Sequence, residues 1–188
     1  MQTANSYIAR WTHCSATEIL ERAVFIADND PAASFPCIVE ACMIMLPQRH
    51  PVDATTLRAF ATLFKRLGLA HCAVAPILLE HISVLPEPLA FVDILPSIIH
   101  SNSLLVTSAF HKLRSILLSD ETLTLPILNI LVDLPLSPEQ KHDVTLIMED
   151  ALSSIDEGDL PFLVRSLLKT LMLSPNSYTV ARIRYEVL

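Results

Sequence analysis

Seven histidines are the side chains of this sequence with the widest chemical range, since an imidazole can bind a metal ion or carry a proton near neutral pH. None has the H-E-x-x-H spacing that places two ligands on one helix face, and none lies in a Cys-x-x-Cys type of motif. His71 and Cys72 are adjacent, and adjacent helical residues do not face each other. We therefore expect the histidines at helix ends or on the surface; they are His13, His50, His71, His81, His100, His111 and His142.

The acidic stretch DEGD, residues 156–159, is a second candidate because clustered carboxylates can bind calcium. It lacks the alternating oxygen donors, spread over about a dozen residues, that a calcium loop requires. Because Pro161 follows, Asp159 is better interpreted as a helix N-cap. The sequence contains no G-x-S-x-G elbow, and no serine has a context that suggests activation by a base. We therefore predict no catalytic, cofactor-binding or metal-binding residue.

Four basic residues could contact phosphate groups or a partner protein. Arg165 and Lys169 are four residues apart on the polar side of a predicted helix, and Arg182 and Arg184 follow them. Such a cluster suits the backbone of a nucleic acid. The alternative is that these charges only keep a helix soluble.

The overall composition restricts these possibilities further. The chain of 188 residues has a net charge of −7, which gives it no overall attraction to nucleic acid. Only 2 glycines are present, too few for the phosphate-binding loops of P-loop or Rossmann folds. The longest uncharged run, residues 94–110, contains Pro96 and a Ser-Asn-Ser cluster, so we expect no membrane span.

The four cysteines, Cys14, Cys37, Cys42 and Cys72, have no export signal before them. The first residues, MQTANSYIARW, lack the long apolar core of such a signal. We therefore expect reduced core cysteines in a cytosolic or nuclear protein.

The elements that must position these side chains are predicted to be helices. Apolar residues recur at i, i+3, i+4 and i+7 in five stretches: 19–27, 57–67, 106–117, 144–155 and 160–172. Gly68 is a plausible C-cap for the second stretch. Neither clean alternation nor an Asn-Gly or Asp-Gly hairpin turn indicates a strand.

Helix starts follow a repeated pattern. SATE (15–18) and SPEQ (137–140) are capping boxes, and Leu-Pro openings at Pro96, Pro126 and Pro161 place proline in a first helical turn. These three prolines are 30 and 35 residues apart, and another predicted helix lies between each successive pair. This arrangement predicts a right-handed α-solenoid of degenerate HEAT-like helical hairpins. The alternative is an irregular helical bundle.

The stretch 122–171, TLTLPILNILVDLPLSPEQKHDVTLIMEDALSSIDEGDLPFLVRSLLKTL, resembles the Fanconi anaemia group D2 family. The similarity includes LTLPILNILVDLPL and then ALSSIDEGDLPFLVRSLL, and it extends upstream to ILLEHISVLPEPLAFVDILPSII, residues 77–99. It covers roughly residues 70–188. It consists of a long ordered run of small matches and includes no short catalytic motif.

The resemblance implies part of the N-terminal α-solenoid of a large nuclear protein. In that family the protein pairs with its group I paralogue, and the heterodimer clamps DNA during interstrand-crosslink repair. The Fanconi core ubiquitin ligase locks the clamp by modifying one lysine. The implied partners are thus the paralogue, the core ligase, and DNA through the whole complex. The acceptor is expected outside this chain, because no lysine present (Lys65, Lys112, Lys141 or Lys169) has the family's acceptor context.

We accordingly expect residues 1–188 to form a single, non-catalytic helical-repeat segment of a larger protein. Its last residues, TVARIRYEVL, lack the polar outer face of a closing repeat. The alternative function is an unrelated HEAT-like adaptor for protein–protein interaction. A small helical hydrolase has no nucleophile and base to support it.

Overall fold

The computed structural model describes residues 3–30, 33–49, 51–85, 87–99, 103–119, 123–152 and 156–171. All regular secondary structure within these ranges is helical, which confirms the all-α prediction. None of the helices in these ranges is long and apolar enough to cross a membrane. The chain divides into two compact units, Met1–Leu105 and Val106–Leu188, and each is described by itself.

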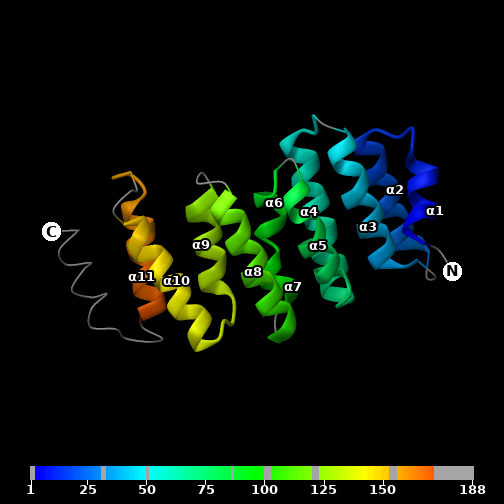
Figure 1. Ribbon diagram of the computed structural model, residues 1–188. Helices are drawn as coiled ribbons and strands as arrows, with labels where there is room; N and C mark the ends of the chain where they lie inside the picture. The colour runs from blue at the N-terminus through cyan, green and yellow to red at the C-terminus, as the bar shows by residue number, and fades with distance from the viewer. Residues whose placement is uncertain are drawn as a thin grey trace. The chain divides into compact units, whose positions relative to one another are not determined.

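Unit 1 arranges its helices in two rows (Figure 1). In the first row α3 packs between α1 and α5, and in the second row α4 packs against α2 on one side and against α6 and α7 on the other. Each helix from α1 to α5 therefore packs against the helix two places further along the chain. The bounds are α1 (Ala4–Trp11), α2 (Ala16–Asn29), α3 (Phe35–Met45), η1 (Leu46–Arg49), α4 (Ala54–Ala70), α5 (Val74–His81), η2 (Ile82–Val84), α6 (Leu89–Val92) and α7 (Leu95–Ile99).

The core of unit 1 is aromatic at both ends. Tyr7 stacks on Trp11 with ring centroids 5.2 Å apart, and Phe64 lies between Phe60 and Phe91 at 5.8 and 5.7 Å. All five rings are almost completely buried. Aromatic side chains bury a large apolar area each, so these clusters contribute strongly to the stability of the unit.

Gly68 does not cap α4, and that prediction is wrong. The helix continues to Ala70, and His71 is the C-cap residue. Gly68 lies inside the helix where α7 crosses it, and a Cβ atom there would meet Cγ2 of Ile98 at 2.8 Å. Glycine is present at this position because two helices approach closely, not because a helix ends.

Unit 2 contains most of α8 (Ser103–Ser119) together with α9 (Thr124–Asp133), α10 (Pro138–Ala151) and α11 (Leu160–Leu171). The last three pack against one another. The predicted apolar stripe of α8 is buried along its whole length: Val106, Ala109, Phe110, Leu113, Ile116 and Leu117.

Proline lies in the first turn of three helices, as predicted. Pro96 and Pro161 are the second residues of α7 and α11, and Pro126 is the third residue of α9. In the first turn the missing N–H of proline removes no intrahelical hydrogen bond.

Both predicted capping boxes are confirmed. The Ser15 hydroxyl accepts a hydrogen bond from the Glu18 backbone N–H at 3.3 Å, and the Glu18 carboxylate accepts one from the Ser15 N–H at 2.7 Å. Ser137 and Gln140 form the same pair at the start of α10. Each box satisfies two backbone donors that the helix leaves free.

Candidate interaction surface on α11

The helix α11 carries two of the four basic residues predicted from the sequence. Asp159 precedes it, and its backbone oxygen accepts from the N–H groups of Phe162 and Leu163, as expected of the N-cap position. Leu163 and Leu167 are fully buried. Burial of this side directs Arg165 and Lys169 to the solvent-exposed side of the helix.

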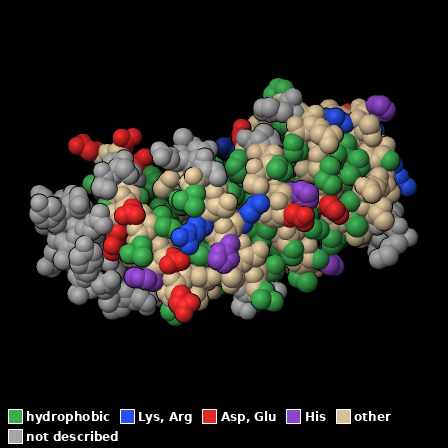
Figure 2. Space-filling view, in the orientation of Figure 1, with side chains coloured by type: hydrophobic (Ala, Val, Ile, Leu, Met, Phe, Trp, Pro, Cys, Tyr) green, Lys and Arg blue, Asp and Glu red, His purple; other side chains and the backbone are tan. Residues whose placement is uncertain are grey.

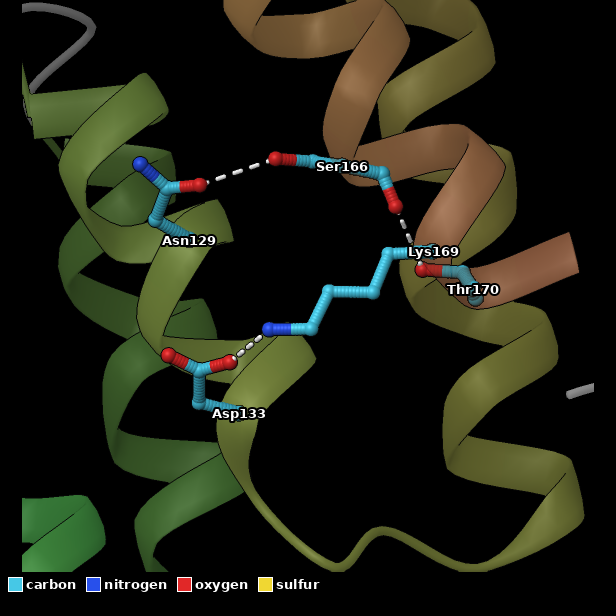
Figure 3. A network of polar contacts seen from close by, with 5 residues as sticks. All are labelled: Asn129, Asp133, Ser166, Lys169 and Thr170. Atoms are coloured by element: carbon cyan, nitrogen blue, oxygen red, sulfur yellow. Dashed lines mark hydrogen bonds and ion pairs between the residues drawn. The ribbon is translucent and has the colours of Figure 1, made fainter. Parts of the chain in front are cut away.

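A polar network joins α11 to α9 (Figure 3). The Ser166 hydroxyl donates to the side-chain oxygen of Asn129 at 2.8 Å, and the Thr170 hydroxyl donates to the Ser166 carbonyl at 3.0 Å. The Lys169 ammonium forms an ion pair with Asp133. The partners on the two helices are 37 and 36 residues apart, so spacing within a helix could not reveal them.

The predicted basic surface is therefore partly neutralised. Lys169 is paired with a carboxylate, while Arg165 is exposed and has no ion pair among the residues described. Arg182 and Arg184 lie outside those residues. An exposed pair such as Lys169 and Asp133 contributes only about 0–1 kcal/mol to stability, but it halves the positive charge on this face.

Two large apolar side chains flank these charges. Phe162 is 59% exposed and Leu168 is 49% exposed. The apolar periodicity assigned Leu168 to the buried stripe, and that assignment is wrong because Leu163 and Leu167 already fill the contact with the unit. The exposed side of α11 is thus a mixed surface of Phe162, Arg165, Leu168 and Lys169, hereafter the α11 face.

The α10 helix contacts α8 through polar groups in a similar way. An ion pair between Arg114 and Asp143 spans 3.4 Å, and the Gln140 side-chain amide donates to the Thr107 hydroxyl at 3.3 Å. The cavity between α9, α10 and α11 holds only about 10 Å³. That is room for one water molecule at most, so this cavity is no ligand site.

Side chains capable of acid–base or metal chemistry are dispersed. No group of three or more His, Cys, Asp or Glu side chains in the described ranges is placed to hold a metal ion. His71 caps the C-terminus of α4, and its ring nitrogen accepts from the Ala73 N–H at 3.2 Å. This is the helix-end position expected from the sequence; His50 and His100 lie outside the described residues.

One expectation about the cysteines, that all of them lie in the core, is wrong. All four are unpaired, and Cys14 and Cys42 are core residues as predicted, with burial raising the pKa of the Cys42 thiol. Cys72 is exposed, in the turn between α4 and α5. The expectation of a core cysteine is wrong at that position, because the turn has no helical periodicity from which burial can be judged.

Basic side chains do not gather in one patch on the visible face of either unit. Figure 2 shows Lys and Arg side chains dispersed among Asp and Glu within each unit. Comparisons of the chain with protein-family models, curated proteins and solved structures find no match.

Proposed function

We propose that this chain is a non-catalytic scaffold segment of a Fanconi anaemia group D2-like protein. In this role it acts in the nucleus, in the repair of DNA interstrand crosslinks. It forms part of a ubiquitin-regulated clamp with the group I paralogue, and DNA is bound by the whole complex. The ubiquitin ligase modifies a lysine outside this chain.

The observation that carries the α-solenoid part of the proposal is the sequence spacing of contacts between every second helix. In unit 2, the side-chain contacts between α8 and α10 and between α9 and α11 join residues 29 to 37 positions apart. In unit 1, Asp28 of α2 pairs with Arg66 of α4 at 2.9 Å, at a similar separation. Stacked helical hairpins of roughly 30–40 residues have contacts at this spacing. The spacing supports an α-solenoid of HEAT-like hairpins; its right hand is part of the proposal.

The α11 face supports contact with a protein. An exposed phenylalanine near an exposed arginine is a combination enriched where proteins meet, and Leu168 adds apolar area beside them. In the proposed complex this face binds the group I paralogue. The second candidate function, a HEAT-like adaptor for another protein, draws on the same surface with a different partner.

Binding of the purified group I paralogue to the immobilised chain tests the assignment. We expect saturable binding that Phe162→Ala weakens by about tenfold, as expected for an aromatic anchor. Leu69→Ala is the matched control, because Leu69 is 62% exposed on α4 and far from α11 in the sequence. A folded chain that fails to bind the paralogue contradicts the Fanconi assignment and leaves the adaptor function.

A further inference from the structure

A hollow of about 530 Å³ lies at α1 and α2, lined by Arg10, Trp11, Glu21, Arg22, Phe25 and Ile26. Trp11 is 1% exposed and stacks on Tyr7, so it forms a rigid base. Phe25 is 67% exposed. An exposed aromatic ring beside a buried one leaves an apolar surface in water that another apolar side chain could cover.

The charges around this hollow favour an acidic occupant. Arg10 and Arg22 are both exposed, and neither forms an ion pair with a side chain in the described ranges. Glu18, which is near Arg22 and is held by Ser15 in the capping box, keeps its negative charge but does not line the hollow. Glu21 is the only carboxylate in the lining. Two arginines against one glutamate give the lining itself a small positive excess, on a chain whose net charge is −7.

We infer that this hollow is a docking site for an amphipathic, acidic helix of a partner protein. Apolar side chains of that helix contact Phe25 and Ile26 above the buried Trp11, and its carboxylates pair with Arg10 and Arg22. The described part of unit 1 is all-helical and offers no sheet edge for an extended peptide, so helix-in-groove binding is the mode that fits. The inference is independent of the Fanconi assignment, because it uses neither α11 nor the paralogue.

The probe is a fluorescent synthetic helix with leucines on one face and glutamates on the other. Its control is the same peptide with every glutamate replaced by lysine. We expect the acidic peptide to bind the full chain at least about tenfold more tightly, since like charges repel across an interface. Anisotropy of the label measures binding, and emission of Trp11, the only tryptophan, reports contact at the hollow.

Three variants locate the site. Phe25→Ala is expected to weaken binding of the acidic peptide by roughly tenfold. The double change Arg10→Glu with Arg22→Glu is expected to reverse the preference, so that the lysine peptide binds more tightly than the acidic one. Leu69→Ala, equally exposed but outside the hollow, is expected to change nothing. All these side chains are exposed, so the variants should fold, which circular dichroism checks.

Several results would overturn the inference. One is equal binding of the two peptides, and another is loss of binding in Leu69→Ala to the same extent as in Phe25→Ala. A third is failure of the acidic peptide to bind at all. A dimer in solution that dissociates on Phe25→Ala would also overturn it, because the occupant would then be a second copy of the chain.

Discussion

The contact between Gly68 and Ile98 is a close helix–helix approach that a single substitution can test. We expect Gly68→Ala to lower the free energy of unfolding. A methyl group there would meet Cγ2 of Ile98 at 2.8 Å and its Cβ at 3.2 Å. Overpacking costs about 1–3 kcal/mol, which outweighs the gain of about 1 kcal/mol in helix propensity. Urea unfolding measures the difference.

Gly158→Ala is the matched control, because a Cβ atom at Gly158 meets nothing within 4 Å. We expect it to be neutral or to stabilise the protein slightly. Ile98→Ala should cost less stability in the Gly68→Ala background than in the parent protein, because it removes the clashing Cγ2. Equal stability of the two glycine variants would contradict the proposed close approach of α7 to α4.

The guanidinium of Arg49 joins η1 to the turn between α1 and α2. Its Nε donates to the Cys14 carbonyl at 2.9 Å, and its Nη2 donates to the Thr12 carbonyl. Arg49→Met should cost about 1.5–3 kcal/mol, the range for hydrogen bonds from charged groups. Arg49→Lys should restore only part of this stability, because a lysine ammonium cannot donate to both carbonyls with the planar, forked geometry of a guanidinium. Chemical denaturation tests this, and Arg58→Met, at an exposed position, should change stability by less than about 0.5 kcal/mol.

The start of α4 makes the stability of that helix depend on pH. Hydrogen bonds from the Thr56 hydroxyl and backbone N–H hold the pKa of Asp53 below its usual 3.8. Because the folded pKa is the lower one, the carboxylate's contribution is fully present above the unfolded value and is lost as pH falls through the folded value. Asp53→Asn keeps a capping side chain but removes the titration. The stability difference between the two proteins should therefore shrink on acidification, and urea titrations at successive pH values measure it.

Helix starts and buried stripes could be predicted because they depend on residues within one or two turns. The capping boxes at Ser15 and Ser137 and the buried side of α8 follow from such local spacing. The ion pair of Lys169 with Asp133 could not be predicted, because its partners meet only after two helices pack. For the same reason the role of Gly68 could not be predicted, since α7 meets it only after packing. The α11 face could be predicted in part, because Phe162 lies outside the apolar stripe of that helix and is therefore expected to be exposed.

Charge is distributed over the whole chain in a way that limits its contact with DNA. There are 13 Lys and Arg residues against 20 Asp and Glu residues. Three of the described cations, Arg66, Arg114 and Lys169, are paired with carboxylates on neighbouring helices. Each pair connects two helices that are two places apart along the chain. Cations that are already paired are less able to replace the counterions of a DNA duplex. The acidic excess therefore acts against binding of DNA by this chain without a partner.

We expect the isolated chain to bind duplex DNA no more tightly than the weakest non-specific binders, with a Kd above about 10⁻⁴ M near physiological salt. Fluorescence anisotropy with a labelled duplex measures this at several salt concentrations. Arg165→Glu should leave the result unchanged, because one unpaired arginine releases too few counterions to offset the acidic excess. Tight binding that weakens steeply with salt and is lost in Arg165→Glu would instead establish the α11 face as a phosphate-binding surface. Because Asp133 neutralises Lys169 on this face, Asp133→Asn should then strengthen that binding further.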